Sequence, residues 1–268
     1  MIKKLALGIV SLGLMTIAGY AASSASDNAG NYAGNWTGNL GSGWGGAWAF
    51  TDNGNGSQSG HFIGDSTTNG TSPSGGINSP ADGAWGLYAN SGATSDATRP
   101  FSGSLSVGDT FSIQIDQGFQ DGGSTVGLGL QNSSGQNLFE IYYIGGDSVN
   151  SWKINSAAGQ QNLSPSVGFS TDGFNLSFTL QPSNMFTGTF SDMHGNSANF
   201  NGTLTTETGG EGISQVRLFN ANAGSGNSNN LFFNNMAIVA VPEPSTVALL
   251  AGPALLGAWF FIRRRRAS

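Results

Sequence analysis

Two histidines, His61 and His194, are the first side chains in this 268-residue chain that could act as a catalytic base or bind a metal ion. Both lie in stretches rich in Gly, Asn and Ser, which are typical of exposed turns. The chain has no cysteine, and a zinc site needs three or four His, Cys or carboxylate ligands at matched spacing. No Gly-x-Ser-x-Gly motif stands between a strand and a helix, as a hydrolase nucleophile would require. The sequence therefore predicts neither a zinc centre nor a serine or cysteine nucleophile.

Oxygen ligands for calcium are the remaining metal-binding pattern. Asp52, Asn53 and Asn55 lie in an Asp-Asn-Gly-Asn-Gly segment, where carboxylate and amide oxygens share a flexible turn. The segment lacks the later bidentate acid of an EF-hand loop. Its Asn-Gly pairs also suit a plain hairpin between residues 48–50 and 61–63. A calcium loop and a hairpin both remain open at this point, and no other cofactor is predicted.

Aromatic side chains near Gly-rich segments could stack on the face of a sugar ring. The candidates are Trp44, Trp48, Trp85, Tyr88 and Trp152, of which Trp48, Trp85 and Trp152 are the predicted carbohydrate contacts. Large rings also fill the cores of β-proteins, so core packing is the alternative for each of them. An exposed, co-planar pair of rings would decide in favour of sugar binding.

Alternating apolar and polar residues predict the strands that would carry these side chains. Residues 111–115, 126–130 and 174–180 each present apolar side chains to one face and polar or glycine positions to the other. Residues 138–144 are nearly all apolar and predict a central strand, while 215–219 and 231–239 predict two late strands. Turns are predicted where Gly, Asn, Asp and Ser cluster, at residues 121–123, 132–135, 145–147, 172–173 and 201–202.

Many short strands joined by such turns predict an all-β fold, an antiparallel β-sandwich of the jelly-roll kind. The 43 glycines are too frequent for helices and suit tight turns. No charged or proline-rich linker interrupts residues 47–240, so we expect one β-sandwich domain there. Residues 26–46 are rich in Gly and Asn without a steady period, and they are predicted to be a loose lead-in.

Several of these stretches resemble the concanavalin A-like (laminin G-type) jelly rolls of bacterial exported proteins. The resemblance covers roughly residues 47–239 and is carried by Phe-Ser-Ile-Gln-Ile at 111–115, Val-Gly-Leu-Gly-Leu-Gln-Asn at 126–132, the strand at 137–146, Arg-Leu-Phe-Asn at 217–220 and Asn-Leu-Phe-Phe-Asn-Asn at 230–235. It implies a fold that lectins, adhesive modules and some glycoside hydrolases share. Function must therefore be argued from a site.

The resemblance also provides a test for hydrolase activity. Laminarinase-like enzymes of this fold carry two glutamates four residues apart with an aspartate between them, because a retaining mechanism needs two carboxyl groups about 5 Å apart. The corresponding strand reads Glu-Ile-Tyr-Tyr-Ile at 140–144, so Tyr142 replaces the aspartate and Ile144 the second glutamate. A lone Glu140 bonded to a neighbouring tyrosine or to Lys153 is expected, and no catalytic residue is predicted.

Residues 241–268 combine a proline-bounded motif, an apolar run at 247–262 and a basic cluster. The motif is Pro242, Glu243, Pro244 and Ser245, and the stop-transfer cluster is Arg263, Arg264, Arg265 and Arg266. The prolines favour an extended segment, the apolar run predicts a short transmembrane helix, and the arginines keep its end cytoplasmic. Together they resemble the PEP-CTERM sorting signal of Gram-negative bacteria. The resemblance implies export, transient anchoring in the inner membrane and processing by an exosortase-type enzyme; a permanent tail anchor is the alternative.

The N-terminus carries a second targeting pattern. Lys3 and Lys4 precede an apolar run at residues 5–18 and small residues at 21–25, which predicts a helical signal peptide with cleavage after Ala25. Cleavage after Ala21 and an uncleaved N-terminal anchor are the alternatives. With both signals, residues 26–240 are expected at the cell surface or in the extracellular matrix.

Without its targeting ends the chain is strongly acidic. Of the 9 basic residues, only Arg99, Lys153 and Arg217 lie in the body. Of the 15 acidic residues, all except Glu243 lie there, so the formal charge of the body is about −11. Such a surface repels phosphate groups, which excludes nucleic acid as a partner. We expect an exported envelope or matrix protein that is non-catalytic and associated with exopolysaccharide. The alternative is a jelly-roll glycoside hydrolase or lyase whose site the sequence does not reveal.

Overall fold

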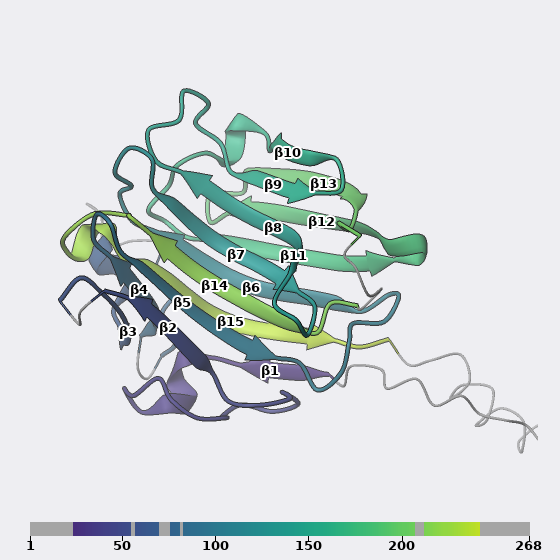
Figure 1. The fold of residues 1–268 in the computed structure, drawn as a ribbon. Helices are drawn as coiled ribbons and strands as arrows, with labels where there is room; N and C mark the ends of the chain where they lie inside the picture. The colour runs from purple at the N-terminus through teal and green to yellow at the C-terminus, as the bar shows by residue number, and fades with distance from the viewer. Residues whose placement is uncertain (1–23, 55–56, 70–75, 81–82, 207–211, 242–268) are drawn as a thin grey trace, which may run out of the picture.

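The computed structural model describes residues 24–54, 57–69, 76–80, 83–206 and 212–241, which form two stacked β-sheets (Figure 1). Their regular elements are strands and short 3-10 helices, with no α-helix among these residues. The strands are β1 (Ala25–Asp27), β2 (Ala49–Asn53), β3 (Ser59–Gly64), β4 (Ala84–Ala89), β5 (Thr94–Pro100), β6 (Thr110–Gln117), β7 (Thr125–Gln131), β8 (Asn137–Ile144), β9 (Lys153–Ser156), β10 (Gly159–Asn162), β11 (Phe174–Gln181), β12 (Met185–Asp192), β13 (Ser197–Thr203), β14 (Gln215–Ala221) and β15 (Leu231–Val239). The 3-10 helices are η1 (Ala29–Tyr32), η2 (Ser66–Asn69), η3 (Pro165–Val167), η4 (Pro182–Asn184) and η5 (Asn227–Asn229).

The strands are arranged as an antiparallel sandwich. The first sheet has the order β13-β12-β11-β6-β15-β4-β3, with β1 added beside β15, and the second has the order β10-β9-β8-β7-β14-β5-β2. Every strand pairing in the described residues is antiparallel. The predicted all-β sandwich is therefore confirmed. The helices predicted for the signal peptide and the C-terminal segment lie outside the described residues.

The alternating sequence of the strands explains why the sandwich forms. In β6 the side chains of Phe111, Ile113 and Ile115 are buried, and β7 and β11 repeat the pattern, so all three predicted strands are confirmed. The two inner faces meet in one large hydrophobic core. Aromatic contacts join the sheets across it, since the ring of Phe139 on β8 lies 4.9 Å from that of Phe178 on β11.

One predicted turn and one predicted hairpin are wrong, and each error has a structural reason. Asn201 and Gly202 lie inside β13, where a Cβ at Gly202 would come within 2.7 Å of the Phe186 ring. The glycine thus makes room for a core side chain instead of forming a turn. The chain after Asp52 does not close a hairpin, because β2 pairs with β5 in the second sheet whereas β3 pairs with β4 in the first. This connection crosses between the sheets, while the other predicted turns do lie between strands.

Residues 26–46 are part of the sandwich, and the prediction of a loose lead-in is wrong. β1 pairs with β15, and η1 places Tyr32 in the core. Trp36 is 2% exposed, and its ring stacks on that of Trp85 with 5.7 Å between the centroids. Burial of two aromatic rings therefore orders a segment whose Gly and Asn content gives no periodic signal.

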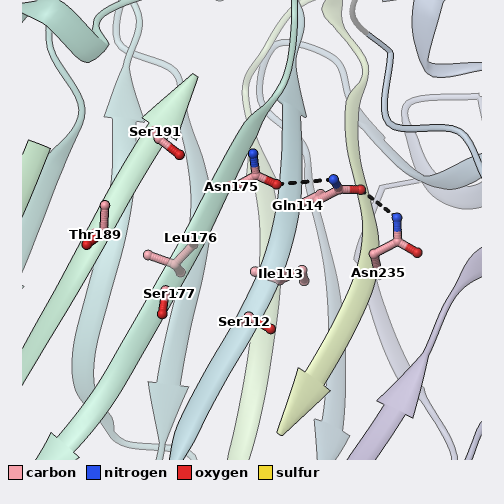
Figure 2. A pocket seen from close by; sticks show the side chains of 9 residues that line it. All are labelled: Ser112, Ile113, Gln114, Asn175, Leu176, Ser177, Thr189, Ser191 and Asn235. Atoms are coloured by element: carbon pink, nitrogen blue, oxygen red, sulfur yellow. Dashed lines mark hydrogen bonds between the residues drawn. The ribbon is translucent and has the colours of Figure 1, made fainter. Parts of the chain in front are cut away.

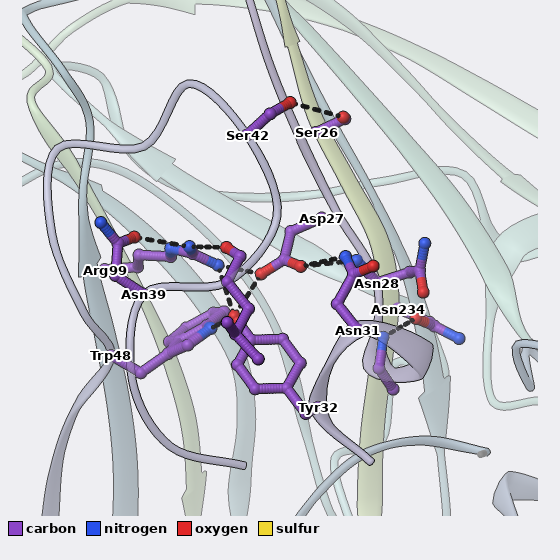
Figure 3. Close-up of polar contacts among 12 residues, drawn as sticks. Ser26, Asp27, Asn28, Asn31, Tyr32, Asn39, Ser42, Trp48, Arg99 and Asn234 are labelled. Atoms are coloured by element: carbon purple, nitrogen blue, oxygen red, sulfur yellow. Dashed lines mark hydrogen bonds and ion pairs between the residues drawn. The ribbon is translucent and has the colours of Figure 1, made fainter. Parts of the chain in front are cut away.

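A buried ion pair ties this segment to the second sheet (Figure 3). Arg99 on β5 pairs with Asp27 on β1, and neither side chain has exposed surface. The Tyr32 hydroxyl donates to the Asp27 carboxylate at 2.5 Å and accepts from Trp48 Nε1 at 3.0 Å. Burial and the adjacent Asp27 carboxylate raise the pKa of Tyr32 above its ordinary value, so the hydroxyl remains a donor. Arg99 also donates to the backbone carbonyl of Leu40, which completes the link.

The two ends of the described chain lie side by side. The backbone N–H of Ala240 donates to Ser24 Oγ at 3.4 Å. Cleavage after Ala25 would remove the first residue of β1, whereas cleavage after Ala21 would leave the strand whole; the cleavage point stays a prediction. The predicted signal peptide, sorting motif and arginine cluster lie outside the described residues. No helix within those residues is long and apolar enough to cross a membrane.

Candidate functional site

The three tryptophans predicted to contact carbohydrate lie in the core. Trp48 is 5% exposed, and Trp85 and Trp152 have no exposed surface. The rings of Trp48 and Trp85 lie 5.3 Å apart, and Trp152 packs against Phe174 and Phe190. A covered ring has no free face for a sugar, so the prediction is corrected to core packing.

The calcium candidates are used inside the protein. One oxygen of the Asp52 carboxylate accepts a 2.6 Å hydrogen bond from Ser95, and the other lies 3.1 Å from His61 Nδ1. Asn53 is exposed at the end of β2, and Asn55 lies outside the described residues. Among the residues that the structure describes, no group of three or more His, Asp or Glu side chains could surround a metal ion. The geometry of Asp52 therefore makes it a structural acceptor and does not support a calcium loop.

Ser95, Asp52 and His61 have the residue types of a catalytic triad in the wrong spatial order. In a triad the histidine stands between the serine and the acid, so that it can accept the serine proton. In this protein Asp52 stands between the other two, and the Ser95 hydroxyl donates to the carboxylate. The His61 ring stacks on Phe50 with 3.5 Å between the centroids. The His61 and Asp52 side chains are 27% and 24% exposed, so the cluster is partly open to solvent, and the order of its residues does not activate the serine.

His194 lies in the turn between β12 and β13, as predicted, and 62% of its side chain is exposed. Its Nε2 lies 2.6 Å from the Asp172 carboxylate. This hydrogen bond and the charge of Asp172 raise the pKa of His194 above its ordinary value. The pair is a solvent-facing contact at a turn.

Glu140 is held by amides rather than by the expected tyrosine or lysine. Its carboxylate accepts hydrogen bonds from Asn137 at 2.5 Å and from Asn155 at 3.0 Å. Lys153 pairs instead with Asp147 at 2.8 Å. Because no other acid follows on β8, that strand does not form the two-carboxylate site of a retaining hydrolase.

A shallow depression on the outer face of the first sheet is lined by uncharged side chains (Figure 2). Its volume is about 340 Å³, and it spans β6, β11, β12 and β15. A row of amides crosses it, because Asn235 donates to Gln114 at 2.6 Å and Gln114 donates to Asn175 at 3.1 Å. The remaining lining residues are Ser112, Ile113, Leu176, Ser177, Thr189 and Ser191.

A second depression of about 280 Å³ continues the first toward β13. The two share Ser177 and Thr189, and the second also contains the polar side chains of Thr179, Thr187, Asn199 and Asn201. Among the residues that the structure describes, none that lines either depression is charged. With neighbouring strands about 4.8 Å apart, the five strands from β15 to β13 give a polar surface roughly 20 Å wide. We call this surface the amide–hydroxyl groove.

The groove follows from the alternation that builds the core. On β11 every second side chain is apolar and buried, and the side chains between them point outward. The sequence predicts that such positions are exposed to solvent, but it does not show which strands lie side by side. β12 and β13 gave no clear strand signal because Gly188 and Gly202 occupy inward positions against the rings of Phe200 and Phe186. The sequence analysis therefore did not predict the groove.

The observed fold places this chain among antiparallel β-sandwich proteins. Its C-terminal residues 240–266 match the PEP-CTERM protein-sorting motif, as the sequence resemblance predicted. The chain is thus an exported protein that the motif anchors in the membrane before processing. No curated protein sequence matches the chain significantly.

Solved structures with a similar arrangement of strands include carbohydrate-active and carbohydrate-binding proteins. A carbohydrate esterase from the Shiga toxin-encoding bacteriophage phi24B has 11% identity and a TM-score of 0.46, over 73% of this chain and 90% of the other. A Bauhinia forficata lectin in complex with GalNAc has 11% identity and a TM-score of 0.44, over 82% and 99%. A carbohydrate-binding module from Bacillus subtilis has 10% identity and a TM-score of 0.41, over 72% and 95%. Likeness at this level is too low to carry an argument about function.

Proposed function

We propose that the exported sandwich binds a neutral extracellular polysaccharide in the amide–hydroxyl groove and does not cleave it. The observation that carries this proposal is the chemistry of the groove. Its amides and hydroxyls can exchange hydrogen bonds with sugar hydroxyls, and the described part of its lining contains no carboxylate or imidazole. Hydrolysis by a pair of carboxyl groups would need acids that this surface lacks.

The placement of charge favours a neutral polymer over an anionic one. Each basic side chain in the described residues is paired with an aspartate: Arg99 with Asp27, Lys153 with Asp147 and Arg217 with Asp96. Two of the three bases have no exposed side-chain surface. No unpaired cation among these residues is therefore left to bind uronate or phosphate groups, which the acidic body also repels.

The sorting motif supports a cell-surface setting for this binding. An exosortase-type enzyme would process the chain near Pro242–Ser245 and release the body into the envelope or matrix of a Gram-negative cell. A shallow, solvent-exposed contact with sugar gives a Kd on the order of micromolar to millimolar for a single protein molecule. Many copies on one surface would raise the overall affinity by multivalency.

The proposal is tested by co-sedimentation of residues 24–241 with the exopolysaccharide of the producing cell. This part contains every described strand and the whole core, so it is expected to fold as a unit. The wild-type body should sediment with the polymer and leave its chain length unchanged. A variant with Gln114→Ala and Asn175→Ala should sediment less. A control with Thr51→Ala and Asn53→Ala, at exposed positions on the other sheet, should behave as wild type.

Two results would contradict the proposal. Equal sedimentation of the groove variant and the control would remove the groove as the binding site. Shortening of the polymer by wild type but not by Glu140→Gln would establish the alternative, a glycoside hydrolase or lyase of the jelly-roll fold.

A further inference from the structure

A separate pocket lies between the paired strands β3 and β4 and the 3-10 helix η5. Its volume is about 350 Å³, and Phe62, Tyr88, Asn90, Asn227 and Asn230 contribute to its lining. It shares no lining residue with the amide–hydroxyl groove, although both depressions involve the first sheet. The ligand that this pocket could bind therefore has to be inferred from its own lining residues.

Two aromatic rings form the floor of this pocket and are positioned by glycines on the paired strand. Phe62 is opposite Gly86 and Tyr88 is opposite Gly60 in the β3–β4 register. A Cβ at Gly86 would lie 2.5 Å from the Phe62 ring, and one at Gly60 would lie 2.6 Å from the Tyr88 hydroxyl. Each of the two side chains thus covers a glycine of the paired strand. Phe62 also packs edge-on against the buried ring of Phe232, with 5.5 Å between the ring centroids. The two rings are half-buried and tilted by 53° to each other, with 6.1 Å between their centroids, so a sugar can stack on one ring while its edge contacts the other.

Two asparagines beside this floor have side-chain amides without a hydrogen-bond partner among the described residues. Asn227 is exposed, whereas Asn230 is only 6% exposed. Asn90 differs, because its amide donates to the backbone carbonyl of Ser57 at 3.2 Å. Although Asn230 as a residue is largely buried, its amide is not among the fully buried unpaired groups, so it is open to the pocket, where the hydroxyl of a ligand can bind it.

The pocket lies at the end of β15 opposite to both ends of the described chain. Asn230 directly precedes β15, and nine strand residues, about 30 Å of chain, separate it from Ala240 beside Ser24. The pocket is therefore at the end of the body that is remote from Ser24 and Ala240.

We propose that this pocket is a second glycan-binding site. The apolar face of a neutral hexopyranose stacks on Tyr88 while its edge contacts the tilted ring of Phe62, and its hydroxyls bind the amides of Asn227 and Asn230. None of the described residues that line the pocket is charged, which matches an uncharged sugar. The inference rests on the proposed function for the class of ligand, but none of its residues belongs to the groove.

The test is a titration of ¹⁵N-labelled residues 24–241 with cellohexaose, laminarihexaose and mannohexaose, followed by NMR. At least one hexaose should shift the backbone resonances of Gly226 and Asn230. Tyr88→Ala should raise the Kd by about fivefold, because one stacking ring is lost. Asn227→Ala should also raise it, and this exposed side chain has no partner in the described fold, so its removal leaves folding intact. The matched control is Tyr142→Ala on β8 of the other sheet, which should bind as wild type.

The outcomes separate this site from the groove. Loss of binding in the groove variant with full binding in Tyr88→Ala and Asn227→Ala would overturn the pocket and leave the proposed function standing. Loss in the pocket variants with full binding in the groove variant would establish the pocket and remove the groove. The absence of resonance shifts with all three hexaoses would overturn the pocket as a neutral-glycan site.

Discussion

The buried Asp27–Arg99 network and the amide–hydroxyl groove are both polar, but they differ in contact with water. Asp27 and Arg99 have no exposed side-chain surface, and the carboxylate also accepts hydrogen bonds from Asn31 and Tyr32. The groove amides bond to one another at the surface, where Asn175 is exposed. A desolvated group depends on fixed partners, whereas an exposed one can exchange its partner for water or for a ligand. In this protein a buried ion pair holds the fold, while the groove presents neutral side chains that can exchange their partners.

β6 shows the same difference along a single strand. Ser112 and Gln114 point outward into the groove, and Asp116 is the next outward position. Asp116 nevertheless has no exposed surface, because η2 covers it and Asn69 donates to its carboxylate at 3.0 Å. A covering segment, rather than residue type, therefore decides which polar side chains are available to a ligand.

The largest loss of stability is expected from Arg99→Met, which breaks the buried Asp27–Arg99 network. The substitution leaves the Asp27 carboxylate buried without its cation, so the free energy of unfolding should fall by about 3–5 kcal/mol. Chemical denaturation of residues 24–241 measures the loss. The control is Arg217→Met, which breaks a partly exposed pair with Asp96 and should cost about 0–1 kcal/mol. Similar losses in both variants would show that burial does not set the energy of these pairs.

Asp116→Asn should change the pH dependence of stability. Burial raises the pKa of Asp116 from 3.8 to about 7. The folded protein therefore keeps a proton that the unfolded chain loses, and this residue makes stability fall as pH rises from about 4 to about 7. The variant should remove that fall and gain at most about 4 kcal/mol at pH 8, with little change at pH 3.5. Denaturation curves across this range measure the slope.

Asp65→Asn is the control for Asp116, because its pKa shift has the opposite sign. Hydrogen bonds from Asn78 and Thr67 lower the pKa of the exposed Asp65 carboxyl. Its contribution to stability is present above the ordinary pKa of the carboxyl and is lost as pH falls through the lowered value. Asp65→Asn should therefore reduce stability at neutral pH. A gain at pH 8 in both variants would mean that removal of any negative charge stabilises this acidic body.

The sequence predicts the sandwich well and the proposed binding surfaces poorly. Local alternation predicted β6, β7 and β11, since each has one face in the core. It could not show that Trp36 would order residues 26–46, because that contact with Trp85 joins distant parts of the chain. The groove and the pocket have the same limit: Asn235 and Gln114 are neighbours only because β15 pairs with β6. Tyr88 was recognised as a candidate ring, but its position in an open pocket depends on Gly60 of the paired strand.

The smallest effect on stability is expected from the groove variant with Gln114→Ala and Asn175→Ala. Both side chains reach solvent, so water can replace the hydrogen bonds that the substitutions remove, and the free energy of unfolding should change by only about 0.5 kcal/mol. The same variant should lose polysaccharide binding. Denaturation measured beside co-sedimentation separates the two effects. A loss of stability close to that of Arg99→Met would show that the amide row holds the sheet together, and the groove would then be a structural feature rather than a ligand surface.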